Sequence, residues 1–196
     1  MRGIVKTAFA MMSVVLGVLL MLLLARSALA ATNQALDPGG GNVVLTSSGL
    51  VTVNGVPLML VTQAHDLAGV NLPNGATVAP GQVIYFVLYV DNVTAFAADD
   101  IRITNLLNEA QFSYVPNSLE TTVVPTGSTN AVIWAGTWSS LTDGVGAPDD
   151  VASFTDNGGT SALDRLTIGA VSGQANQVLS MAGNVLRAVR FRVIVN

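Results

Sequence analysis

Acidic side chains gather in one glycine-rich stretch of the sequence. Asp143 precedes the segment Gly-Val-Gly-Ala-Pro, Asp149 and Asp150 follow it, and Asp156 comes just before an Asn-Gly-Gly turn. Carboxylates in a flexible loop, together with backbone carbonyls, supply the hard oxygen ligands that calcium prefers. The four aspartates are therefore a candidate calcium site, although they lack the alternating acids and the closing glutamate of an EF-hand. The alternative is a set of solvated acidic loops.

The other reactive side chains do not combine into a catalytic motif. The only histidine, His65, precedes Asp66, and adjacent residues on a strand point to opposite faces of a sheet. The chain contains no cysteine, no nucleophile elbow and no zinc-protease motif. One histidine without cysteine does not make the usual zinc site. We therefore expect a non-enzymatic protein whose one candidate cofactor is calcium.

Two tryptophans lie close together in the sequence. Trp134 and Trp138 flank Gly136, and a strand would place both side chains on one face. Such a pair suits a platform for stacking sugars, but it suits packing in a hydrophobic core as well. Core packing is the interpretation we favour.

The start of the chain predicts a signal peptide in helical form. Two basic residues precede an apolar run over residues 8–25, and Ala28-Leu29-Ala30 follows directly after Arg26 and Ser27. A positive start, an apolar middle and small residues at positions −3 and −1 are what signal peptidase requires. We place cleavage between Ala30 and Ala31. The alternative is an uncleaved anchor, because the run is long enough to span a membrane.

Removal of residues 1–30 changes the charge of the protein. Three of the eight basic residues leave with the signal segment, so five remain against twelve acids, a net charge of −7. The processed chain contains no lysine. This balance excludes the basic patches that bind nucleic acid or anionic membranes. Contact with a membrane is expected only through an uncleaved signal segment, and the expected location is extracellular, either secreted or on the cell surface.

The remainder of the chain predicts a single all-β domain. Residues 31–42 are polar and rich in glycine and predict a flexible leader, and the domain itself spans 43–196. Many short apolar segments separated by turn signals, without alternating helices, predict an immunoglobulin-like or jelly-roll-like sandwich. The predicted strands are 43–46, 50–54, 57–62, 83–91, 100–105, 111–115, 119–124, 131–135, 151–155, 163–168, 176–181 and 186–195.

One of these strands is apolar on both faces. The run 83–90 places Tyr85, Val87 and Tyr89 on one face and equally apolar residues on the other. A strand of this kind must be covered on its second face. The cover is either another segment of the same domain, which we favour, or a neighbouring subunit, for which these three residues would be the interface.

The same strand belongs to a longer pattern. A Pro-Gly turn precedes it and an asparagine ends it; a loop of small residues, a second strand and an aromatic strand then follow. Proline fixes φ and glycine accepts positive φ, which suits a chain reversal, and the asparagine can bond nearby backbone amides. The segments are Val78-Ala79-Pro80-Gly81-Gln82-Val83-Ile84-Tyr85, Val90-Asp91-Asn92, Ala97-Ala98-Asp99-Asp100-Ile101-Arg102-Ile103-Thr104-Asn105 and Phe112-Ser113-Tyr114-Val115-Pro116-Asn117-Ser118.

This pattern resembles the conserved-repeat domain of unknown function found in bacterial and archaeal cell-surface proteins. The resemblance covers about a quarter of the processed chain. It implies an immunoglobulin-like sandwich with a structural or adhesive role at the surface. Asn105 and the following Leu106-Leu107-Asn108 depart from the Asp and Leu-Pro turn of that family, and the pattern occurs once rather than in tandem, which argues against a passive stalk of repeats.

Together these features predict a secreted structural protein that assembles with copies of itself into a filament or surface layer. The candidate assembly strand comprises Val43, Val44 and Leu45, which follow the leader and would insert into the sheet of a neighbour. The alternative is an adhesion module that binds carbohydrate or protein.

Overall fold

The computed structural model describes residues 33–37, 41–45, 48–53, 56–73, 75–144, 150–159, 163–169 and 176–196. The predicted signal segment, its cleavage site at Ala30 and Ala31, and Asp149 lie outside these residues. Within the described part, no helix is both long and apolar enough to cross a membrane.

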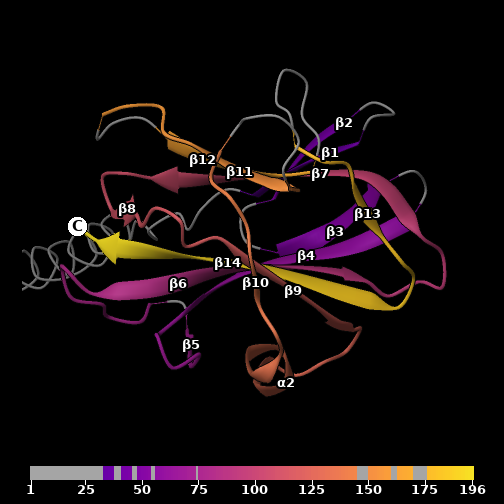
Figure 1. The fold of residues 1–196 in the computed structure, drawn as a ribbon, viewed down its shortest axis with the longest axis horizontal. Helices are drawn as coiled ribbons and strands as arrows, with labels where there is room; N and C mark the ends of the chain where they lie inside the picture. The colour runs from indigo at the N-terminus through magenta and orange to yellow at the C-terminus, as the bar shows by residue number, and fades with distance from the viewer. Residues whose placement is uncertain are drawn as a thin grey trace, which may run out of the picture. The chain divides into compact units, whose positions relative to one another are not determined.

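The described chain forms two antiparallel sheets that face one another (Figure 1). This confirms the prediction of an all-β sandwich. Sheet A has the order β11-β12-β7-β1-β2, and β13 also pairs with β7; sheet B has the order β10-β9-β14-β6-β4-β3, with β5 on β4 and β8 on β14. The strands of sheet A are β1 (Asn33–Asp37), β2 (Gly41–Leu45), β7 (Ala98–Asn108), β11 (Ala152–Thr155), β12 (Leu163–Ile168) and β13 (Leu179–Met181). Those of sheet B are β3 (Ser48–Val53), β4 (Val56–His65), β5 (Asn71–Leu72), β6 (Val83–Asn92), β8 (Phe112–Tyr114), β9 (Glu120–Pro125), β10 (Ser139–Ser140) and β14 (Val185–Val195).

The centre of sheet B is the pair β6 and β14. Their register runs without interruption from Val185 opposite Asn92 to Ile194 opposite Val83. Both strands are rich in β-branched and aromatic residues, which fit a pleated and buried surface. The final strand of the chain is therefore a central strand of its sheet, with β6 on one side and β9 and β8 on the other.

The main hydrophobic core lies between the two sheets. Alternate residues along each strand point inward, as the period of two requires. Each of the following residues is at most 2% exposed. From sheet B they include Ile84, Leu88, Val189, Phe191 and Val193, and from sheet A Ile101, Ile103, Leu107, Leu166 and Ile168.

One predicted strand is a helix instead. The segment predicted as strand 131–135 forms α2 (Asn130–Ala135), which lies on the side of sheet B that faces away from sheet A (Figure 1). Its β-branched residues favour a strand in isolation. The helix begins because the Thr129 side chain accepts a hydrogen bond from the Val132 amide, and it ends at Gly136, whose amide donates to the Ile133 carbonyl.

The predicted leader is also partly wrong. Residues 33–37 of the leader form β1, and residues 41–42 begin β2. β1 pairs with β2 on one side and with β7 on the other. The segment is largely polar and has no apolar alternation of its own, so its strand conformation goes with the backbone pairing to β2 and β7 rather than with a pattern in its sequence.

Candidate functional site

β1 and β2 form an amino-terminal hairpin at one edge of sheet A. β1 pairs antiparallel with β7 from Asn33 opposite Asn105 to Leu36 opposite Arg102. β2, which contains the candidate assembly residues Val43, Val44 and Leu45, pairs only with β1 among the described strands. The strand that joins the hairpin to the body of the domain is therefore β1, and the predicted assembly strand is the outer strand of the same hairpin.

β7 is the strand on which this hairpin depends. Ile101, Ile103 and Leu107 of β7 are buried in the core, and β12 pairs with its other edge from Ile103 to Asn108. An unpaired edge of such a strand would present backbone amides and carbonyls ready to bond another chain. The hairpin satisfies that edge between Arg102 and Asn105.

The connection from the hairpin to the rest of the domain is very short. β2 ends at Leu45 in sheet A and β3 begins at Ser48 in sheet B, so only two residues separate strands of different sheets. In an exchanged dimer the terminal element makes the same pairing with a neighbour that it makes within its own chain. Short hinge connections favour this exchange.

The second face of β6 is covered from within the same chain. Val87 is fully buried and Tyr89 is 6% exposed, and both pack in a second cluster with Ile133 of α2 and with Leu186 and Ala188 of β14. Tyr85 is half-buried beside them. The proposed subunit interface at Tyr85, Val87 and Tyr89 is therefore wrong, since α2 and the residues after it provide the cover that the apolar face requires.

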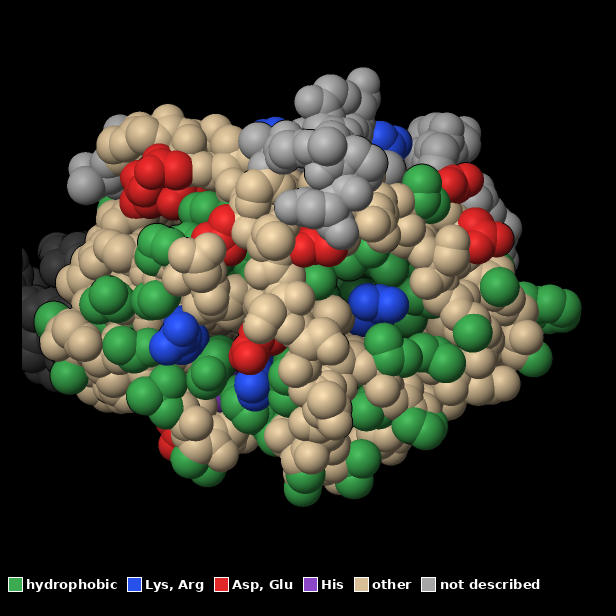
Figure 2. All heavy atoms as spheres, viewed as in Figure 1, with side chains coloured by type: hydrophobic (Ala, Val, Ile, Leu, Met, Phe, Trp, Pro, Cys, Tyr) green, Lys and Arg blue, Asp and Glu red, His purple; other side chains and the backbone are tan. Residues whose placement is uncertain are grey.

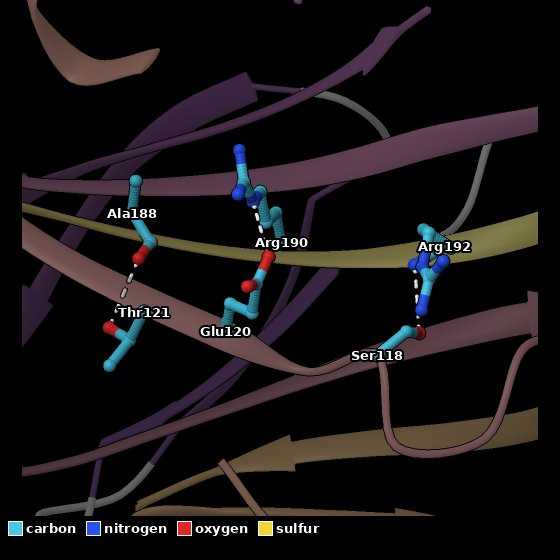
Figure 3. Close-up of polar contacts among 6 residues, drawn as sticks. All are labelled: Ser118, Glu120, Thr121, Ala188, Arg190 and Arg192. Atoms are coloured by element: carbon cyan, nitrogen blue, oxygen red, sulfur yellow. Dashed lines mark hydrogen bonds and ion pairs between the residues drawn. The ribbon is translucent and has the colours of Figure 1, made fainter. Parts of the chain in front are cut away.

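An arginine holds this cover in place. The guanidinium carbon of Arg190 lies 3.9 Å from the centroid of the Trp138 ring, 4.7 Å from that of Trp134 and 4.9 Å from that of Tyr85. Its Nε donates to Glu120 Oε2 at 2.7 Å. Figure 3 shows Arg190 and Glu120 reaching toward one another from β14 and β9, with further bonds from Thr121 to the Ala188 carbonyl and from the Arg192 amide to Ser118.

The two tryptophans are half-buried and pack against this second cluster, which agrees with the core packing that we favoured. Arg190 lies over both indole rings, and the Trp134 ring is so close to Gly69 that a Cβ there would lie 2.6 Å from it. The centroids of the two indole rings lie 6.0 Å apart, and the ring planes are inclined by 49°. Stacking a sugar requires a free ring face, which these contacts reduce.

Under this cover lies a small polar network around His65, which is fully buried. Nδ1 lies 3.1 Å from the Gly69 carbonyl oxygen, and Nε2 lies 3.1 Å from the Tyr89 hydroxyl. The oxygen of that hydroxyl also lies 3.2 Å from Asn130 Oδ1 of α2. Burial lowers the pKa of His65 below its ordinary value of 6.5 and raises the pKa of Tyr89 to about 12. Both groups are neutral at pH 7 and connect the helix to the sheet.

The predicted calcium ligands do not form a group of three or more among the described residues. Asp143 accepts hydrogen bonds from the Tyr114 hydroxyl at 2.6 Å and from the Asn117 amide at 2.7 Å. Asp150 accepts from the amides of Thr142 and Ala152. These two carboxylates brace loops, and the geometry therefore does not support a site built from Asp143, Asp150 and Asp156; Asp149 lies outside the described residues.

A different acidic cluster lies at the carboxyl end of β7. Oxygen atoms of Glu109, Asp156 and Asp164 lie within 4.8 Å of one another, and Figure 2 shows acidic side chains gathered at the upper left, over this end of sheet A. Partial desolvation, together with a hydrogen bond and the charge of Asp164, raises the pKa of Glu109. Sequence reasoning found only Asp156, because pairing of β12 with β7 brings the other two together.

Asn92, the asparagine at the end of β6, organises the connection to β7. It is fully buried. Its Nδ2 donates to the carbonyls of Phe96 and Ala182, and its Oδ1 accepts from the amide and the hydroxyl of Thr94. The backbone-bonding role expected for this residue is confirmed, and it fixes the start of β7.

Comparison with models of protein families, with curated proteins and with solved structures finds no match to this chain. The resemblance to a cell-surface repeat domain therefore rests on its motif alone.

Proposed function

We propose that this protein is a secreted, non-enzymatic structural subunit that assembles with copies of itself at the cell surface by exchanging its amino-terminal hairpin. One observation carries the proposal: β1 completes sheet A by pairing with β7, although it belongs to a terminal hairpin joined to the domain by two residues. The same four pairs, made with the β7 of a neighbour, would join two copies without any new type of contact.

The composition of the chain agrees with this proposal. The processed chain has no lysine and no cysteine, so its copies have neither lysine-based nor disulfide crosslinks to join them. Backbone hydrogen bonds between strands are independent of side-chain charge, and they join acidic copies that would otherwise repel one another. β2 pairs with the other edge of β1, so the inserted strand does not itself present an unpaired edge.

The test uses the absence of native cysteine. Gln34 and Thr104 lie opposite one another in the β1–β7 register, and paired strand residues are about 5 Å apart between Cα atoms, which suits a disulfide. Gln34→Cys and Thr104→Cys are placed in separate chains 31–196 of different tag lengths, and the two proteins are refolded together at micromolar concentration and oxidised. We expect a disulfide-linked heterodimer.

Two controls make this experiment decisive. Ser180→Cys replaces Thr104→Cys as an exposed strand position that is not opposite β1, and it should give no specific heterodimer. The double variant Gln34→Cys/Thr104→Cys should oxidise fully, which shows that the register forms. If the double variant crosslinks only within single chains, and the mixture yields no heterodimer above the Ser180→Cys control, exchange is wrong.

A further inference from the structure

We propose that Arg187 of β14 forms a binding site for a carboxylate that is carried on an apolar chain, the chemistry of a fatty acid. The proposal is independent of hairpin exchange, because the site lies in sheet B and uses neither β1 nor β7. Three features carry it: the face of β14 on which Arg187 lies, a guanidinium that has no acidic partner among the described residues, and apolar side chains beside it that are open to solvent on one side.

Arg187 lies on the face of β14 that is directed toward sheet A. Successive side chains of a strand alternate between the two faces of a sheet, so Arg187 shares its face with every second residue that follows it. Among these, Val189, Phe191 and Val193 belong to the main core between the sheets. Arg187 is therefore a charged residue on the core-facing side of a central strand, a position that apolar residues normally occupy.

The guanidinium of Arg187 forms no ion pair with any described residue. Its side chain makes one hydrogen bond to that part of the chain, from Nη1 to the Thr121 hydroxyl at 3.3 Å, and its Nε is buried without a partner there. Arg190, three residues along the same strand, instead donates its Nε to Glu120 Oε2 at 2.7 Å. Burial lowers the pKa of Arg187 below its ordinary value, and no acidic neighbour counteracts this shift.

The edge of the guanidinium that is left over is the one that suits a carboxylate. Nε and Nη2 point the same way and form a fork that donates two parallel hydrogen bonds to the two oxygens of one carboxylate. The bond to Thr121 uses Nη1 and leaves this fork available. A singly charged carboxylate also matches the single positive charge, whereas a phosphate dianion would bring a surplus negative charge into apolar surroundings.

The side chains beside Arg187 are apolar and are open to solvent toward β9. In the register, Arg187 lies opposite Val90 of β6 and Val123 of β9, and residues opposite one another share a face of the sheet. Val90 is 1% exposed, but Val123 is 51% exposed although it lies on the core-facing side. Sheet A therefore does not cover sheet B at Val123. Figure 2 shows a hollow in the right half of the view, over the region of β9 and β14, where a basic side chain lies among hydrophobic ones.

These features set two requirements for the ligand. Its charged end is a flat anion that accepts hydrogen bonds from Nε and Nη2 of Arg187, and its remainder is apolar, so that it replaces water at Val123 with favourable contacts. A fatty acid meets both requirements and can enter from the side of β9 without opening the core. Its binding compensates a buried positive charge, which is unfavourable while it has no partner.

The test is a calorimetric titration of the purified protein with octanoate, and with octanol and acetate as probes that lack the carboxylate or the chain. We expect octanoate to bind about tenfold more tightly than either probe. Arg187→Met should weaken octanoate binding by about tenfold or more, and Arg187→Lys, which keeps the charge but not the fork, should weaken it less. Arg165→Met, at an exposed arginine of β12, is the control and should bind as the wild type does.

Melting curves distinguish a binding role from a purely structural one. Without octanoate, Arg187→Met should melt at or above the temperature of the wild type, because the variant removes an unpaired buried charge; octanoate should raise the melting temperature of the wild type only. Octanoate binding that is equally tight in Arg187→Met, or octanol binding as tight as octanoate binding, would overturn the proposal. If Arg187→Met does not fold, the same comparison is made with Arg187→Lys, and equal octanoate affinity there overturns the role of the fork.

Discussion

Asn92 holds two segments that are distant in sequence. Its amide donates to carbonyls of the β6–β7 connection and of the turn before β14, and its oxygen accepts two bonds from Thr94. Truncation to alanine leaves these buried groups unpaired, so we expect Asn92→Ala to lower the free energy of unfolding by about 2–4 kcal/mol. Urea denaturation measures the change. Asn71→Ala, at an exposed asparagine of β5, is the control and should change stability by less than about 0.5 kcal/mol.

His65 makes stability depend on pH. Burial lowers its pKa in the folded state below 6.5, so the unfolded chain takes up a proton at a higher pH than the folded chain. The stabilisation is therefore complete above pH 6.5 and is lost as the pH falls toward the lowered pKa. We expect the melting temperature of the wild-type protein to fall more between pH 7.5 and pH 5 than that of His65→Gln. Parallel melting curves over this range would contradict the assignment.

At the scale of elements, Arg190 of β14 connects sheet B to α2 and to the residues that follow it. Arg190 contacts both tryptophans and bonds Glu120, and only 13% of its side chain is exposed. Removing it takes away the cation–π contacts and the packing of its stem. We expect Arg190→Ala to destabilise the protein by about 2–3 kcal/mol and to increase binding of a hydrophobic dye, as Val87 and Tyr89 become accessible. Arg165→Ala, at an exposed arginine of β12, should do neither.

Most strands could be predicted from the sequence because their own side chains define them. The alternation of β14 and the apolar run of β6 follow directly from the period of a strand that is buried on one face or on both. β1 could not be predicted in this way, since its residues are largely polar and its partner β7 lies about 70 residues later in the chain. α2 was missed because a capping threonine outweighed the strand propensity of valine and isoleucine.

The candidate site was predictable only in part for the same reason. Val43, Val44 and Leu45 stand out by composition, and they do form a strand of the terminal hairpin. The acceptor edge at Arg102–Asn105 and the acidic cluster at Glu109, Asp156 and Asp164 depend on which strands pair. The spacing of residues along one sequence does not reveal which strands pair. The covering role of Trp134 and Trp138, in contrast, followed from the general use of aromatics in cores.

For the whole molecule, exchange requires that the rest of the domain can bind the β1–β2 hairpin when that hairpin belongs to another chain. We expect the fragment 46–196 to fold with a lowered melting temperature, because sheet B and the pairing of β7 with β12 are retained. A synthetic peptide of residues 31–45 should bind this fragment and raise its melting temperature in proportion to the logarithm of peptide concentration. A scrambled peptide of the same composition is the control, and equal shifts from both peptides would contradict the prediction.

The position of β14 has a consequence for the timing of folding. This strand contributes Val189, Phe191 and Val193 to the core and supplies the pairing partner of β6, β8 and β9. It is also the last of these strands to leave the ribosome. Sheet B cannot be completed until it arrives, and pairings between strands so distant in sequence form slowly. A chain that stops before β14 therefore lacks the strand that joins β6 to β8 and β9, and sheet B closes only after synthesis has passed Val195.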